Sequence, residues 1–107
     1  MRSEKILVQT KDDIVKILRE KLPYLNSEFG VRRIGLFGSY AVGKPNENSD
    51  VDIIAEFDKP IGFRIVEFAE YIEQLFGKRI DILTPAGINS IRNKQIADEI
   101  ERTIVYV

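Results

Sequence analysis

Residues 31–57 read VRRIGLFGSYAVGKPNENSDVDIIAEF and contain two apolar segments, 31–37 and 51–57, that we predict to be β-strands. Small residues follow the first segment at 39–43, and a run of turn-forming residues at 45–49 predicts a loop before the second. About a dozen residues separate the two strands and leave no room for a full helix. We therefore expect the strands to be antiparallel neighbours in one sheet.

A helix is expected on the N-terminal side of these strands. Thr10 can cap it, and Asp12 and Asp13 suit the positive end of the helix dipole. Pro23 should end or kink this helix, and Gly30 is suited to its C-cap. The residues that share its apolar face at helical spacing are Ile14, Ile17, Leu18, Leu22 and Leu25.

The second strand is followed by a further helix and strand. The apolar spacing over residues 65–76 predicts an amphipathic helix, which Gly77 ends. Residues 79–83 form a short third strand. Strand, helix and strand make a βαβ unit, so we expect its two strands to be parallel and joined by a right-handed crossover.

The last part of the chain is less regular. Pro-Ala-Gly at 85–87 should break the third strand, and a polar helix is expected over about 90–102. Residues 104–107 form either an edge strand or a packed tail. The expected fold class is α/β (α+β), with a small mixed sheet, helices packed on one face, and a single domain over residues 1–107.

Composition excludes several classes of function. The 107 residues include no cysteine and no histidine, which excludes disulfides, zinc thiolate sites, cysteine nucleophiles and histidine bases. A net charge of −1 argues against bulk electrostatic binding of nucleic acid or an anionic membrane. No stretch approaches the roughly 18 apolar residues of a membrane span. A cytoplasmic protein is the expectation.

Three aspartates are predicted to share one face of the sheet. Side chains alternate along a strand, so Val51 and Ile53 face the helices while Asp50 and Asp52 point to the opposite face. Asp81, on the third strand, points to that same opposite face. Oxygen ligands without nearby His or Cys suit Mg²⁺ or Mn²⁺ in phosphoryl or nucleotidyl transfer. In the alternative interpretation, Asp50 is a turn residue, Asp52 is a solvated strand residue, and Asp81 is an unrelated salt-bridge partner of Arg79.

Gly38 and Ser39 directly follow the first strand. Glycine allows the backbone to approach a phosphate closely, and Ser39 adds a hydroxyl beside any exposed backbone N–H groups. Gly43 keeps the turn tight. The alternative interpretation is a plain turn between two strands.

The two motifs together resemble the signature of the DNA polymerase β-type nucleotidyltransferase superfamily. The sequences LFGSYAVG at 36–43 and SDVDI at 49–53 are similar to the minimal nucleotidyltransferase (MNT) family, and Asp81 matches its third carboxylate. The resemblance covers roughly residues 31–85 and the order of the flanking helices. Members of this family are small prokaryotic proteins, many of them antitoxins encoded beside HEPN-domain toxins.

The resemblance implies a role for each motif residue. Gly38 and Ser39 would bind the β- and γ-phosphates of ATP, and Asp50 and Asp52 would hold two Mg²⁺ ions. Asp81 would help to activate the attacking hydroxyl, as a metal ligand or general base. The reaction would transfer AMP to a tyrosine hydroxyl of a HEPN toxin. Because the chain has no residues left for a substrate domain, a partner or a second copy in a homo-oligomer must supply the acceptor.

One position departs from the family pattern. Many members have arginine where this chain has Val42, so a positive group near the phosphates is absent there, and Lys44 is a possible substitute. The alternative function is therefore a non-catalytic antitoxin that neutralises its partner by complex formation. Haloacid-dehalogenase-type phosphatases and nucleotide-sugar glycosyltransferases also use Asp-x-Asp, but neither explains Gly38-Ser39.

Overall fold

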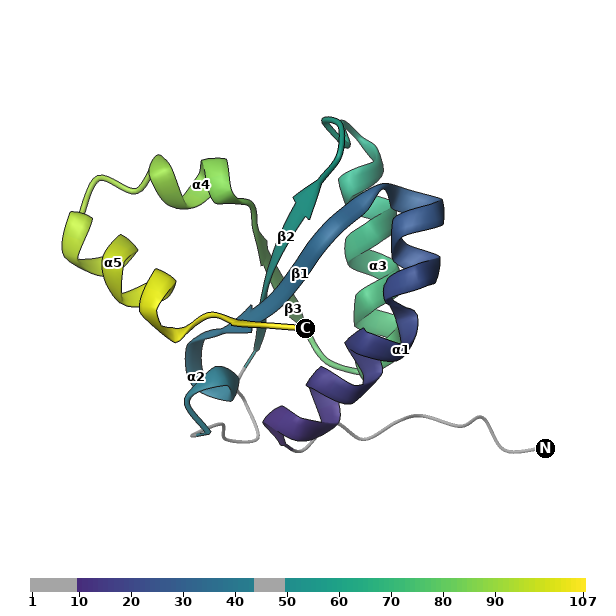
Figure 1. Cartoon of the computed structure of the whole chain (residues 1–107), viewed down its shortest axis with the longest axis horizontal. Coiled ribbons are helices and arrows are strands. Elements are labelled where there is room, and N and C mark those ends of the chain that lie inside the picture. The colour runs from purple at the N-terminus through teal and green to yellow at the C-terminus, as the bar shows by residue number, and fades with distance from the viewer. Residues whose placement is uncertain (1–9, 44–49) are drawn as a thin grey trace.

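The computed structural model describes residues 10–43 and 50–107, which form one mixed sheet with helices on both faces (Figure 1). The possible cation Lys44 and the predicted loop at 45–49 lie outside the described residues. In chain order the elements are α1 Lys11–Phe29, β1 Val31–Phe37, α2 Gly38–Ala41, β2 Val51–Phe57, α3 Arg64–Phe76, β3 Ile80–Leu83, α4 Pro85–Asn89, α5 Lys94–Thr103 and β4 Val105–Tyr106.

The sheet has the strand order β3-β2-β1-β4. β1 and β2 are antiparallel, and β2 and β3 are parallel with α3 as their crossover, so both predicted pairings are confirmed. β4 pairs antiparallel with the other edge of β1. Of the two structures expected for residues 104–107, the edge strand is therefore the one that forms.

Helix α1 begins and ends where its capping residues predict. Thr10 and Asp13 form a capping box, each side chain accepting a hydrogen bond from the other's backbone N–H at 3.2 Å. Gly30 closes the helix in the left-handed conformation, with φ +75°. No helix in residues 10–43 or 50–107 combines the length and apolar composition that a transmembrane span needs.

Pro23 does not end α1, which corrects one of the two outcomes expected for it. The helix continues to Phe29 and bends along its length (Figure 1). Buried residues lie on both sides of the proline, Ile14 and Leu18 before it and Leu25 after it. Burial of this apolar face outweighs the backbone hydrogen bond that the proline ring removes.

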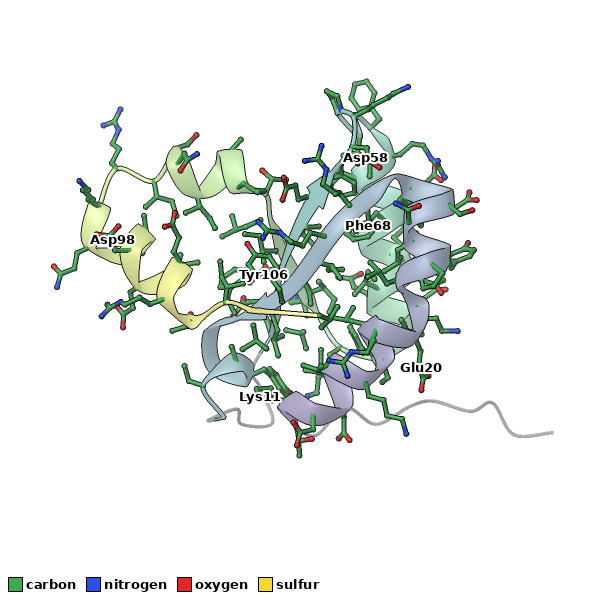
Figure 2. All side chains as sticks on the ribbon, viewed as in Figure 1. Lys11, Glu20, Asp58, Phe68, Asp98 and Tyr106 are labelled. Atoms are coloured by element: carbon green, nitrogen blue, oxygen red, sulfur yellow. The ribbon has the colours of Figure 1, made fainter. Side chains whose placement is uncertain are left out.

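The main core lies between one face of the sheet and helices α1 and α3 (Figure 1). Alternate residues of β2, Val51, Ile53 and Ala55, are fully buried there, as predicted. From α3, Phe68 packs edge-on against Phe57 at 5.3 Å between ring centroids, and Figure 2 shows it on the inner side of the helix. This layer fixes β2 and therefore the direction in which its other face points.

The helices do not all pack on one face, so this detail of the expected architecture is wrong. A second, smaller core of Phe37, Ile54 and Ile88 lies on the opposite face, under α4 and α5. The apolar Phe37 and Ile54 alternate on the same face as the aspartates, and they give the C-terminal helices a surface to cover.

Residues 85–87 begin a helix as well as ending a strand. The Thr84 side chain accepts a hydrogen bond from the Gly87 N–H at 3.1 Å, and Pro85 occupies the first position of α4. Asn93 then caps α5 by accepting from the backbone of Gln95 and Ile96. The helix expected over about 90–102 therefore begins later, at Lys94, as α5, and α4 is an additional short helix where only a break was expected.

Candidate active site

The register of the parallel strands brings two of the predicted aspartates together. Asp52 on β2 is directly paired with Asp81 on β3, and both lie on the face opposite to the main core. Asp52 is half-buried, whereas Asp81 is exposed. One carboxylate of the pair is therefore partly shielded from water, and the other is accessible to a second molecule.

The electrostatics of Asp52 follow from this pairing. Burial, then the charges of Asp81 and Asp50, and then the hydrogen bond to Asp81 raise its pKa from 3.8 to about 6. Each of these causes disfavours the ionised carboxylate. A cation beside the pair would lower the pKa of Asp52 and stabilise its ionised form, so the arrangement favours binding of a positive ion.

Asp50 lies beside this pair without completing a three-ligand cluster. It is half-buried, immediately before β2, and its charge contributes to the raised pKa of Asp52. Across residues 10–43 and 50–107, no three acidic side chains are arranged closely enough to hold a metal ion together. The structure thus assembles Asp52 and Asp81, while Asp50 as a third ligand stays a prediction.

The Gly-Ser turn presses directly against Asp52. Phe37, at the end of β1, pairs with Asp52, and Gly38 follows with φ +74°. A Cβ atom at position 38 would collide with Asp52 Oδ2 and lie 3.0 Å from its Cγ. Glycine is required here both by the backbone conformation and by the space that the carboxylate occupies.

The residues after Gly38 form the short helix α2 rather than an open turn. Ser39 is half-buried and lies two residues after Phe37, the residue of β1 that pairs with Asp52. Tyr40 and Ala41 are buried, and Tyr40 belongs to the main core. Val42 ends the helix with 50% of its surface exposed. The turn is thus anchored by Tyr40 on one side while Gly38 stays against the carboxylates.

Sequence reasoning missed the part of α5 that faces this turn. Helix α5 and the turn after β1 enclose a hollow of about 290 Å³, named here the α5 slot. Its lining residues are Phe37, Gly38, Val42, Ile96, Glu99, Ile100 and Thr103. The available signal was the sparse apolar stripe of Ile96 and Ile100 in the predicted helix. That stripe indicates a half-buried helix face but not the element it packs against.

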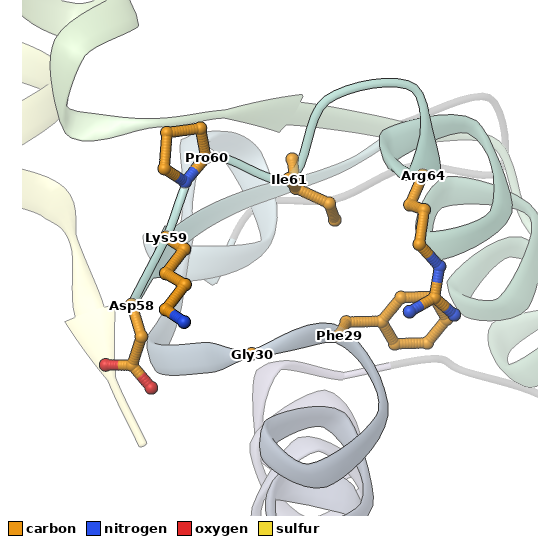
Figure 3. Close-up of a pocket in the computed structure, with 7 residues that line it drawn as sticks. All are labelled: Phe29, Gly30, Asp58, Lys59, Pro60, Ile61 and Arg64. Carbon is orange, nitrogen blue, oxygen red and sulfur yellow. The ribbon is translucent and has the colours of Figure 1, made fainter.

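Another hollow, of about 370 Å³, lies at the opposite end of β1 and β2 (Figure 3). Phe29, Ile61 and Arg64 contribute to its lining. The Arg64 guanidinium donates to the backbone carbonyl of Glu28 at 2.7 Å and to its carboxylate at 3.0 Å. Arg64 is engaged in these structural contacts, and the hollow is separated from Asp52 by the length of the strand.

Parallel strands hold a carboxylate pair against a glycine turn, and the sheet that contains them has the order β3-β2-β1-β4. This arrangement is typical of a class of nucleotide-handling domain. The fold is that of a solved candidate minimal nucleotidyltransferase, with a TM-score of 0.68 at 22% identity, covering 91% of this chain and 95% of that one. The family model described as nucleotidyltransferase domain matches residues 11–106. The chain belongs to this family and is a nucleotidyltransferase.

Relatives of similar length carry a more specific name. The protein adenylyltransferase MntA of Thermococcus cleftensis is 39% identical over 99 residues, which cover 92% of this chain and 96% of the relative. A candidate protein adenylyltransferase of Methanocaldococcus jannaschii is 37% identical over 94% of this chain and all of its own length, 100%. A toxin–antitoxin crystal structure with AMP-PNP shares the fold, with a TM-score of 0.60 at 21% identity, covering 92% of this chain and 72% of that one.

Proposed function

We propose that this chain transfers AMP from ATP to a side-chain hydroxyl of a partner protein, a HEPN-family toxin, and so acts as an antitoxin. The observation that carries the proposal is the Asp52–Asp81 pair packed against Gly38. The name of the Thermococcus cleftensis relative supports adenylyl transfer to protein, and the toxin–antitoxin structure with AMP-PNP supports the nucleotide and the kind of partner.

The donor atoms at the site fit a magnesium ion. Mg²⁺ in nucleotide-handling sites is held by one or two carboxylates together with substrate phosphates, and it needs oxygen ligands. Asp52 and Asp81 provide such a pair, with Asp50 as the candidate third ligand beside it. When bound, Mg²⁺ neutralises the phosphate oxygens on which negative charge increases during the transfer.

The chain's own residues would position the reactants. The backbone at Gly38 and the Ser39 hydroxyl hold the β- and γ-phosphates beside Asp52. The acceptor oxygen forms a bond to the α-phosphorus while the bond from this phosphorus to pyrophosphate breaks. The exposed carboxylate of Asp81 accepts the proton that the hydroxyl loses. Positioning in this way supplies a large part of the rate of such displacements.

The acceptor hydroxyl comes from another molecule. The single nucleotidyltransferase domain over residues 1–107 is part of this proposal, and the exposed side chain of Asp81 leaves room for a partner to approach. A second copy of the chain is the other possible source of an acceptor. Identifying the neighbouring open reading frame would decide which protein to test first.

The experiment is a label-transfer assay. Purified protein is incubated with α-labelled ATP, Mg²⁺ and the product of the adjacent reading frame, and label on that protein is the expected result. Asp52→Ala should abolish the label. Asp98→Ala is the matched control, because Asp98 is exposed on α5 at the far edge of the molecule (Figure 2). Label transfer that survives Asp52→Ala contradicts the proposal.

A non-catalytic antitoxin is the second candidate, and Val42 is the observation that favours it. An apolar side chain, half exposed at the end of α2, occupies the position at which the family resemblance leads one to expect arginine. In that case the chain would neutralise its partner by complex formation alone. Neutralisation of the partner in cells by the Asp52→Ala protein would favour this candidate over the enzyme.

A further inference from the structure

The α5 slot has the composition of a site for a flat, uncharged ring. Val42 from the end of α2 and Ile96 and Ile100 from α5 form its apolar walls. Val42 and Ile96 keep 50% and 49% of their surfaces exposed, although they lie on the sides of their helices that face this hollow. A ring inserted between them would remove apolar surface from water on both sides.

The slot is continuous with the carboxylate pair through one residue. Gly38 lines the slot and also packs against Asp52. A ligand whose phosphates lie beside Asp52 would therefore reach the slot with its other end. Among the residues that the structure describes, no lysine or arginine lines the slot, so its chemistry suits the uncharged end of a nucleotide and not the phosphates.

The polar side chains that line the slot offer hydrogen-bond acceptors to a ligand. Glu99 contributes a carboxylate. The Thr103 hydroxyl donates to the Ile100 carbonyl at 3.0 Å, which leaves only its lone pairs for a ligand. These groups match a base whose edge carries an amino group, which donates two N–H bonds.

We propose that the α5 slot binds the base of the donor nucleotide and that Glu99 selects a base with an exocyclic amine. This inference rests on the proposed function, because it assigns the second half of the same substrate. The acceptor's aromatic ring is the less suitable occupant, since its one hydroxyl must be at the α-phosphorus rather than at Glu99. Helix α5 thereby becomes a specificity element, with Ile96, Glu99, Ile100 and Thr103 on one face at helical spacing.

Calorimetry with two ligands separates the slot from the phosphate site. The ligands are Mg-ATP and inorganic tripolyphosphate with Mg²⁺, which has no base. Ile96→Asn should weaken ATP binding by about fivefold to tenfold and leave tripolyphosphate binding unchanged. Val66→Asn is the matched control, since Val66 is 57% exposed on α3, a helix of the opposite face, and it should change neither affinity.

Each outcome of the calorimetry has a distinct meaning. Unchanged ATP affinity in Ile96→Asn, or equal weakening of both ligands, overturns the slot proposal while the proposed function stands. Failure of the wild-type protein to bind either ligand overturns both. Circular dichroism of each variant, matching wild type, verifies that Ile96→Asn acts at the slot and not through the fold.

The role of Glu99 is tested with a second base. ITP replaces the exocyclic amine of ATP with a carbonyl oxygen, so wild type should bind ATP more tightly than ITP. In Glu99→Gln the amide can donate to that carbonyl, and the preference for ATP should fall by about fivefold or more. An unchanged ratio of the two affinities overturns the assignment of Glu99.

Discussion

Asp52 contributes one component of the pH dependence of the molecule's stability. Its pKa in the folded protein is raised to about 6 from 3.8, so between these values the folded state binds more protons than the unfolded chain. The free energy of unfolding therefore falls as the pH rises through this interval, and the loss persists above it. Asp52→Asn removes the titrating group and should remove this component of the pH dependence.

Urea unfolding at about pH 4 and about pH 7.5, without divalent ions, measures this effect. Relative to Asp52→Asn, wild type should lose stability between the two pH values, by less than about 1 kcal/mol because the carboxylate is partly in water. If both proteins show the same change in stability, the raised pKa of Asp52 is wrong.

Gly38 carries the second prediction at this scale. Gly38→Ala adds a Cβ that collides with Asp52, in a backbone conformation that alanine rarely adopts. The substitution should destabilise the fold by about 1–3 kcal/mol and abolish nucleotide binding. Unfolding and ATP titration measure the two effects.

The control is Gly43→Ala. Gly43 has nearly the same φ, +75°, but a Cβ there meets no atom of the described residues within 4 Å. It should show the conformational cost alone and keep nucleotide binding. Equal loss of binding in the two variants would mean that the contact between Gly38 and Asp52 has no special role.

The residue scale is also where prediction from sequence succeeded best. Alternation along a strand placed Asp52 and Asp81 on one face, and the parallel pairing then placed them opposite each other. The contact of Gly38 with Asp52 was not predictable, because it depends on the direction of the backbone after β1. The position of Asp50 also depends on backbone outside the regular strand.

At the scale of elements, glycine at position 35 lets β4 pack closely against β1. A Cβ at Gly35 would lie 3.0 Å from both the Val105 carbonyl oxygen and Tyr106 Cδ1. The Arg33 guanidinium lies over the Tyr106 ring at 3.9 Å and holds the same strand. β4 in turn follows α5 directly, so its pairing positions the helix that lines the α5 slot.

Gly35→Ala should therefore displace β4 and lower the free energy of unfolding by about 1–3 kcal/mol, as overpacked sites do. Gly87→Ala is the control, because its Cβ would meet nothing closer than 3.4 Å and alanine favours α4. Chemical denaturation compares them. A Gly35→Ala protein as stable as Gly87→Ala would show that β4 adapts without cost.

Element boundaries were predictable where a local capping signal exists. Thr10, Gly30 and Gly77 mark the ends of α1 and α3 as expected. Pro23 left two outcomes open, because the decision between ending and continuing a helix depends on the tertiary burial of residues on both of its sides. Which helix covers which face was also hidden, since Ile54 and Asp52 share a face that is both apolar and acidic.

At the scale of the whole molecule, the sheet separates support from chemistry. Helices α1 and α3 cover one face and make the main core, while α4 and α5 cover only part of the other (Figure 1). The carboxylate pair lies on this partly covered face, next to the α5 slot. A ligand that contacts the carboxylate pair, the Gly38 turn and α5 together would connect the sheet to α5. Without the ligand, these elements are joined on this face by the small second core.

Ligand binding should therefore stabilise the entire fold. At 100 times its dissociation constant, a ligand that binds only the folded state adds about 2.7 kcal/mol, which for a domain of this size raises Tm by roughly 10 °C or more. We expect this shift with Mg-ATP in a thermal scan, and its loss when a chelator removes the magnesium. Asp52→Ala should show no shift with any of these additions, whereas Asp98→Ala should behave as wild type. A shift with ATP that persists in the chelator, or in Asp52→Ala, would mean that the nucleotide binds away from the carboxylate pair.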